Sequence, residues 1–307
     1  MSPKLKRFKA ISLAILFVGA LSVREARADG ILVGSLADAA NYAVLYSGTG
    51  GNTAHISNVT VNGNIGIGGT GQVDFSGPGT INGRLDFAAP TNTGQYSNNN
   101  GANVGPTSAN YNQSNVTTDL ANLSILNVQL TLAAGTALAL NAGNQSLNIN
   151  TGTLDAFGRY VFTVTSYAKG NGDILTINGD GVHSVVFNFA NGLNLGGDVA
   201  LAGALNPDMV VWNFGGTGNV QLNNNASSFP NLAFQGIILA PNNAISVVNA
   251  NLTGRVFGGD SHDLQIVSGD TINAPQAVPE PASMILLGLG LVGAAGSIRR
   301  RRNARDA

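Results

Sequence analysis

Cysteine is absent from this 307-residue chain, which excludes disulfides, thiolate nucleophiles and thiolate metal ligands. Basic residues are scarce away from the two ends. Residues 29–277 contain no glutamate, 13 aspartates and only four basic residues, giving a formal net charge of −9. The four are Arg84, Arg159, Lys169 and Arg255. This charge argues against binding to nucleic acid or to anionic membranes.

The N-terminal residues have the three parts of a secretory signal peptide. Basic residues within 4–9 precede a short apolar run over 10–23, and the pattern Ala26-Arg27-Ala28 follows. The run is short for a stable membrane span. We therefore expect residues 1–28 to be a signal peptide that is cut after Ala28. The alternative is an amphipathic or membrane-anchoring N-terminus.

The C-terminal residues also fall into three parts. An uncharged, mostly apolar run over 282–298 would form a helix about 25 Å long, slightly shorter than the hydrocarbon core of a bilayer. The basic cluster after it would stay in the cytoplasm with residues 303–307. The prolines before it would keep the chain extended and open to a processing enzyme. The flanking motifs are Val278-Pro279-Glu280-Pro281 and Arg299-Arg300-Arg301-Arg302.

This order of motifs resembles the PEP-CTERM sorting signal. The resemblance implies that residues 278–302, including a transmembrane helix, are recognised and removed by an exosortase in a Gram-negative bacterium that makes exopolysaccharide. Signal peptidase and the exosortase would be partners during export, and the chain would be anchored only transiently in the inner membrane. The alternative is a permanent single-span anchor.

Between these signals, short β-type runs separated by Gly and Asn dominate residues 29–277, and many alternate apolar with polar residues. TVNGNIGI at Thr60 returns 20 residues later as TINGRLDF at Thr80, and TIN recurs at Thr176 and Thr271. Such a repeat is typical of a β-solenoid, whose stacked coils share one core and can align asparagines in ladders. We expect one mainly β domain of this kind, with a β-sandwich as the alternative.

Three stretches depart from the strand pattern. Residues 36–45 and 116–132 have the apolar spacing of helices, and the second should lie along the flank of the solenoid. Asp119 would be favoured near the N-terminus of this second helix by the helix dipole. Residues 88–114, rich in Asn, Gly and Ser, are expected to form a long surface loop. The expected apolar stripe of the second helix is Leu120, Leu123, Ile125, Leu126, Leu130 and Leu132.

The body carries a second resemblance. NYAVLYSGTGGNTAHISNVTVNGNIGIGG near its start, and VVFNF, VVWNFGG and FQGIILAPNNAISVVNANLTGRVFGGD later, resemble the choice-of-anchor A family, in which one exported body occurs with alternative cell-surface anchors. The same order of features is similar to ice-binding-protein-like adhesive domains. That similarity implies a right-handed β-helix with one helix alongside, and so an architecture more than an activity.

The sequence shows no pattern of catalytic or metal-binding residues. The three histidines have no HxxxH or HExxH spacing, and the four basic residues of the body are not clustered. We therefore expect no catalytic residue, no cofactor and no metal. Segments around Asp180, Asp260 and Asp263 loosely resemble the loops of calcium-binding β-rolls, but they do not repeat and are interpreted as turns.

Two other features bear on binding. Thr and Asn of a Thr-x-Asn triple share one face of a strand, so stacked triples would form a flat polar ladder able to meet ice or a carbohydrate polymer. The alternative is a solvated strand face near a turn. Trp212 is expected in the core and not as a platform for sugars. The triples are Thr60/Asn62, Thr80/Asn82 and Thr176/Asn178.

The sequence thus predicts an exported, non-enzymatic adhesive or matrix protein at the cell surface or outside the cell. Its partner would be exopolysaccharide or a neighbouring cell surface, met through many weak contacts. The alternatives are a protein that binds ice or another crystalline surface, and a surface enzyme that acts on polysaccharide. No nucleic-acid partner is expected, and the sequence does not identify the ligand-binding residues.

Overall fold

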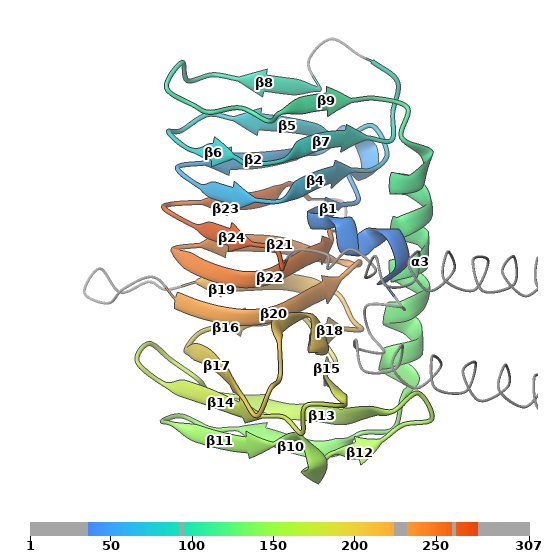
Figure 1. Cartoon of the computed structure of the whole chain (residues 1–307), viewed down its shortest axis with the longest axis vertical. Helices are drawn as coiled ribbons and strands as arrows, with labels where there is room; N and C mark the ends of the chain where they lie inside the picture. Colours follow the sequence, from blue (N-terminus) through green and yellow to red (C-terminus); the bar gives the residue numbers. More distant parts are fainter. Residues whose placement is uncertain (1–35, 92–94, 224–231, 260–261, 276–307) are drawn as a thin grey trace, which may run out of the picture. The chain divides into compact units, whose positions relative to one another are not determined.

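The computed structural model describes residues 36–91, 95–223, 232–259 and 262–275. Within these ranges, short parallel strands stack coil upon coil, with one long helix along the side (Figure 1). The parallel pairing argues against the sandwich alternative, because sandwich sheets are antiparallel. Ala26, Ala28 and Asp260 lie outside the described residues, and so do residues 278–307 with both C-terminal motifs.

Strands from residue 136 onward build the coils at one end and up to the middle of the stack. They form, with neighbouring turns, β10 (Thr136–Leu140), β11 (Gln145–Asn148), η3 (Ile149–Thr151), β12 (Thr153–Leu154), β13 (Arg159–Tyr167), β14 (Ile174–Asn178), β15 (Ser184–Phe189), β16 (Asn194–Leu195), β17 (Asp198–Ala202), η4 (Pro207–Met209), β18 (Val210–Phe214), β19 (Gly218–Asn223), β20 (Leu232–Ala240), β21 (Asn243–Val248), β22 (Ala250–Gly258), β23 (Leu264–Val267) and β24 (Thr271–Asn273).

The earlier part of the chain builds the coils at the other end. Its elements are η1 (Ala37–Asn41), β1 (Tyr42–Tyr46), η2 (Thr49–Gly51), β2 (Thr53–Ser57), β3 (Thr60–Asn62), β4 (Asn64–Ile67), β5 (Gln72–Phe75), β6 (Thr80–Ile81), β7 (Arg84–Phe87), β8 (Tyr96–Asn98), β9 (Ser108–Asn110) and α3 (Ser114–Leu132). The strands of the two halves share two sheets, of fourteen and seven strands, and a three-stranded sheet belongs to the later half alone.

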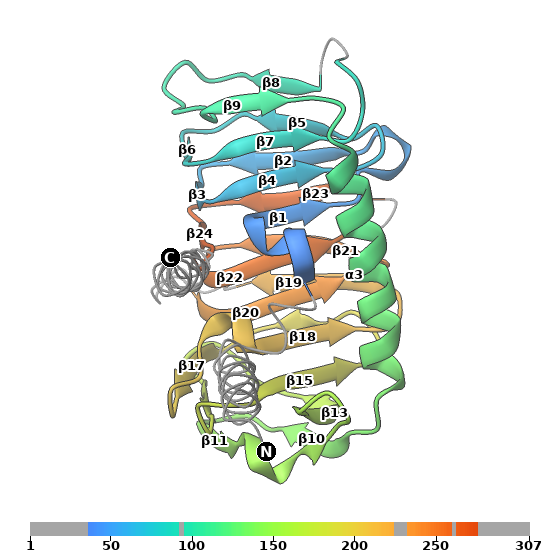
Figure 2. The same ribbon diagram turned by 45° about the vertical axis from the view of Figure 1, so that its right-hand side comes forward.

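The chain enters this stack in the middle. β1 pairs with β4 on one side and with β22 on the other, so that Val44 lies beside Val256. From β1 the coils run to one end at β9, the helix α3 returns along the stack, and the remaining coils run back from β10 to β22 (Figure 2). The first and last coils therefore meet at an internal seam.

The core is a continuous row of apolar residues inside the coils. Phe162, Phe187, Trp212 and Phe234 come from four successive coils, with neighbouring ring centroids 5.6, 4.7 and 4.8 Å apart. Trp212 is completely buried, which confirms its prediction as a core residue. The repeat is confirmed too, because Thr60 pairs in register with Thr80 and Thr271.

The helix predicted over 116–132 is confirmed as α3, which packs on the outer side of the fourteen-stranded sheet. Leu123, Leu126 and Leu130 of the expected stripe are buried. Ile125 and Leu132 are 58% and 79% exposed, so the stripe was wrong at these two positions. The sheet and η1 cover only one side of α3, whereas apolar residues in its sequence extend beyond that side.

Asp119 does not have the role expected from the helix dipole. It lies beyond the first helical turn and is 2% exposed, with Asp38 of η1 as a neighbouring charge. Burial, with a smaller contribution from Asp38, raises the pKa of this carboxyl to about 6. The surroundings therefore penalise its ionised form.

Two other predictions were wrong. The helix expected over 36–45 is a short 3-10 turn followed by β1. All five residues of β1 are buried, because α3 and η1 cover the outer side of its sheet, and such a strand has no period-2 signal. The loop expected over 88–114 instead contains β8 and β9, and its Val104 forms a bridge with Thr80, so this segment builds the coil at one end of the stack.

Candidate functional site

The Thr-x-Asn triples of the seam region form one ladder on the outside of the stack. Thr271, Thr60 and Thr80 lie side by side on β24, β3 and β6. The residues between the Thr and Asn positions, such as Val61 and Ile272, are buried, so the triples face outward. The three strands lie one above another at the edge of the stack (Figure 2).

The asparagines of this ladder bind each other. The Asn82 amide donates to Oδ1 of Asn62 at 2.7 Å, and the Asn62 amide donates to Oδ1 of Asn273 at 2.6 Å. The third predicted triple is not part of this ladder. Thr176 and Asn178 lie in the three-stranded sheet, where the Asn178 amide donates to Ser146 Oγ at 2.8 Å.

A shallow cavity of about 300 Å³ lies where the threonines of the ladder begin, and it is lined by the turns 58–60, 78–79 and 269–271. Asp270 is among the lining residues and is 1% exposed. Its Oδ1 accepts the Ala250 N–H at 2.6 Å, while its buried Oδ2 accepts no hydrogen bond from the described residues. Burial raises the pKa of Asp270 to about 7, although the backbone N–H groups of Ala250 and Val267 act in the opposite direction.

A second polar group lies on the seven-stranded sheet, around His55. Its Nε2 is 3.3 Å from Asp263 Oδ2, and its Nδ1 is 3.6 Å from Asp74 Oδ2. Asp74 also accepts hydrogen bonds from Ser97 and Asn99. Among the described residues no group of His, Asp or Glu is arranged to hold a metal ion. His55 therefore lies between two carboxylates that have other donors of their own.

The two described aspartates of the candidate calcium loops serve as turn and strand contacts. Asp180 accepts the N–H groups of Val182 and His183, and Asp263 accepts the N–H of Thr53 at 2.7 Å. These bonds fit the interpretation of the segments as turns.

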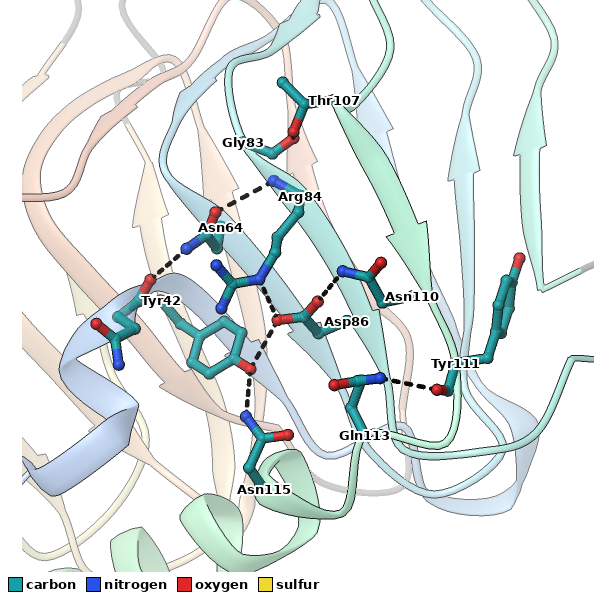
Figure 3. A network of polar contacts seen from close by, with 11 residues as sticks. Tyr42, Asn64, Gly83, Arg84, Asp86, Thr107, Asn110, Tyr111, Gln113 and Asn115 are labelled. Carbon is teal, nitrogen blue, oxygen red and sulfur yellow. Dashed lines mark hydrogen bonds and ion pairs between the residues drawn. The ribbon is translucent and has the colours of Figure 1, made fainter.

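A third polar network surrounds the buried carboxylate of Asp86 (Figure 3). Its Oδ2 accepts from Tyr42 Oη at 2.9 Å and from Arg84 Nε at 2.7 Å, and its Oδ1 accepts from Asn110 at 2.8 Å. Asn115, at the start of α3, donates to Tyr42 Oη at 3.0 Å. Burial and Asp86 raise the pKa of Tyr42 to about 12, so the phenol stays protonated. The network fastens α3 to β1, β7 and β9.

The other basic residues of the body are also engaged within the protein. Arg159 pairs with Asp155 at 2.7 Å, and the Lys169 ammonium donates to the carbonyl of Gly143. Arg255, 1% exposed, is paired with Asp208 at 2.9 Å. The four basic side chains are thus engaged in four separate structural contacts.

These observations define a mainly β protein with parallel sheets and one side helix. The chain belongs to the ice-binding-like adhesive domain family, whose model matches residues 25–266. A second model, the PEP-CTERM protein-sorting motif, matches residues 277–302. The motif marks the chain as an exported protein of the kind that exosortases sort to the cell surface. The matching families are of adhesive and sorting type and are not families of enzymes.

Solved structures with a similar fold include several ice-binding proteins. The chain resembles one from the Antarctic ascomycete Antarctomyces psychrotrophicus, with a TM-score of 0.52, 17% identity, and coverage of 79% of this chain and 98% of that one. A glycosylated ice-binding protein from an Arctic yeast has a TM-score of 0.47 and 16% identity, with 80% and 95% covered. An ice-binding protein domain of Shewanella frigidimarina has a TM-score of 0.45 and 16% identity. The match covers 78% of this chain and 97% of that one. At this identity the likeness concerns the fold alone.

No curated protein matches the chain in the sequence search. In the part of the chain that the structure describes, no helix has the length and apolar character that a membrane crossing needs. The expected transmembrane helix at 282–298 lies outside that part.

Proposed function

We propose that this chain is an exported, non-enzymatic adhesive protein of the cell surface or extracellular matrix, associated with exopolysaccharide. The observation that carries the proposal is the order of the two family matches, an adhesive domain followed directly by a sorting motif. In this proposal the stacked coils form a right-handed β-solenoid, a rod that presents repeated polar side chains to a polymer. Many weak contacts along a rod add up to stable attachment.

The proposal includes the processing of both ends. Residues 1–28 would be removed by signal peptidase after Ala28, leaving 29–277 as the adhesive domain. Residues 278–302 would be held in the inner membrane by their apolar run, with Arg299–Arg302 and residues 303–307 on the cytoplasmic side. The exosortase would then cut at Val278-Pro279-Glu280-Pro281 and release the domain to the surface.

The experiment is the intact mass of the protein purified from its own host. A chain that starts near Asp29 and ends near Pro279 to Pro281, with or without an added mass, supports processing and release. A chain that still carries Arg299–Arg302 contradicts it and makes the tail a permanent anchor. Deletion of the gene should also lower the matrix-bound biomass, and unchanged biomass would count against the adhesive role.

A second candidate function is binding to ice or another crystalline surface. The fold likeness to the ascomycete ice-binding protein favours it. Thermal hysteresis of the purified protein separates this candidate from the first. The third candidate, a polysaccharide-active enzyme, predicts release of reducing or unsaturated sugars. The separate structural engagement of Arg84, Arg159, Lys169 and Arg255 weighs against it.

A further inference from the structure

The ladder and the cavity beside it have two residues in common. Thr60 and Thr271 belong both to the threonine column and to the cavity lining. The side-chain amides of the neighbouring asparagines hydrogen-bond one another, and these bonds hold the strands that carry the threonines in place. Among the described residues no side chain or backbone group hydrogen-bonds the hydroxyls of Thr60, Thr80 and Thr271, and these side chains are only half-buried.

Asp270 supplies a second and independent observation. Asp270 is 1% exposed, and its Oδ2 accepts no hydrogen bond from the described residues, so that oxygen carries a cost of desolvation. Because Asp270 lines the cavity, a ligand with a hydroxyl group could provide the missing donor. Threonine hydroxyls can both donate and accept, and therefore suit the neighbouring hydroxyls of the same ligand.

The charge of the site limits the class of ligand. The outward positions on β24, β3 and β6 are Thr and Asn, with no charged side chain among them. The body as a whole carries 13 aspartates against four basic residues, which opposes an acidic polymer. A repeating, uncharged ligand with many hydroxyls fits both facts, since successive coils repeat about every 4.8 Å.

We propose that the cavity at Asp270 and the threonine column Thr271–Thr60–Thr80 bind an uncharged polysaccharide, with Asp270 accepting a hydrogen bond from a sugar hydroxyl. The inference rests on the proposed adhesive function and assigns its site and ligand class. The polymer would lie across the coils, one contact after another. Each contact is weak, so binding would depend on several coils at once.

The test uses the processed protein purified from its host, with cellulose and chitin particles as uncharged probes and alginate beads as the acidic probe. The variant Thr60→Val/Thr271→Val removes two hydroxyls and keeps the β-branched shape. The matched control is Thr53→Val/Thr217→Val, which removes two hydroxyls at positions outside the column. Thermal unfolding of each variant checks that the fold is intact.

We expect retention on at least one uncharged polymer and none on alginate. The Thr60/Thr271 variant should bind that polymer about tenfold more weakly, as the loss of two hydrogen bonds predicts, while the control binds like the wild type. Asp270→Asn, which replaces the free acceptor by a donor, should also weaken retention. The inference is overturned if the Thr60/Thr271 variant binds like the wild type, or if the wild type binds no uncharged polymer.

Two further results distinguish a failure of the proposed site from a failure of the proposed adhesive function. Retention on alginate that is indifferent to Thr60 and Thr271 would leave an adhesive protein with a different site and ligand. Unchanged biomass in the deletion strain, together with no retention on any polymer, would remove both the adhesive function and this site.

Discussion

Arg255 and Asp208 form a two-bond ion pair inside the protein, with Nε 2.9 Å from Oδ1 and Nη2 3.1 Å from Oδ2. The same guanidinium donates to the carbonyl oxygens of Tyr42 and Pro275, both at 2.8 Å. Arg255 lies on β22, and Tyr42 begins β1. One side chain therefore joins the last coil to the first at the internal seam.

Loss of this arginine should destabilise the whole stack. We expect Arg255→Met to lower the free energy of unfolding by about 3–5 kcal/mol, because it leaves the Asp208 carboxylate buried without its partner. Urea denaturation measures the change. The double variant Arg255→Met/Asp208→Leu should recover much of the loss, since no charge is then left unpaired. Equal losses in both variants would contradict this account.

A buried amide network should matter in the same way for the docking of α3. Asn213 accepts from Asn127 at 2.7 Å and donates to Oδ1 of Asn188 at 2.8 Å. We expect Asn213→Leu to lower the free energy of unfolding by about 1–3 kcal/mol, because Asn127 and Asn188 each lose a buried hydrogen-bond partner. Hydrogen exchange of α3 amides should speed up. The exposed Asn219→Leu is the control, and an equal effect there would argue against the network.

A glycine inside strand β22 should resist substitution. Gly254 has φ +153°, and a Cβ added to it would lie 1.9 Å from the carbonyl oxygen of Gly236 on the neighbouring strand. Because that atom belongs to the backbone and cannot move aside easily, Gly254→Ala should lower the free energy of unfolding by more than about 3 kcal/mol or prevent folding. Gly101→Ala, where a Cβ meets nothing within 4 Å, should leave the thermal midpoint nearly unchanged. Similar midpoints for the two variants would refute the packing argument.

The buried carboxyl groups of Asp270 and Asp119 should make the free energy of unfolding depend on pH at values above the ordinary pKa of aspartate. The pKa of Asp270 is raised to about 7 by burial and that of Asp119 to about 6. Between about pH 4 and pH 7 the folded state therefore holds more protons than the unfolded state, and the free energy of unfolding should fall as pH rises. For Asp270 the loss is at most about 4 kcal/mol.

The isosteric Asp270→Asn variant tests whether Asp270 causes this pH dependence. It keeps an acceptor for the Ala250 N–H and removes the ionisation. Its unfolding free energy, measured by urea denaturation from pH 4.5 to pH 8, should fall less with pH than that of the wild type. Identical pH profiles would show that Asp270 does not titrate in this range.

Part of the proposed binding surface could be predicted from sequence, because stacked repeats bring equivalent positions together. The spacing between Thr60 and Thr80 placed both in one column, and the structure agrees. The cavity beside them could not be predicted. An isolated aspartate such as Asp270 is a common turn residue, and nothing local shows that two other coils will bury it.

The sequence by itself determined the properties that depend on neighbours along the chain. These are the end signals as recognisable patterns, the alternating strands, the helix near 116–132 and the register of Thr60 with Thr80. Periodicity and composition act over a few residues, so they can be read from one strand or helix alone.

Only the tertiary structure decided which coils became neighbours. All coils have similar alternating patterns, so no local signal shows that Val44 pairs with Val256 or that α3 returns along the stack. For the same reason the sequence did not predict β1, whose two faces are both covered, or the end coil within 88–114, whose polar residues resemble those of a loop. Burial from both sides and pairing across about 200 residues are set by the summed packing of the whole stack.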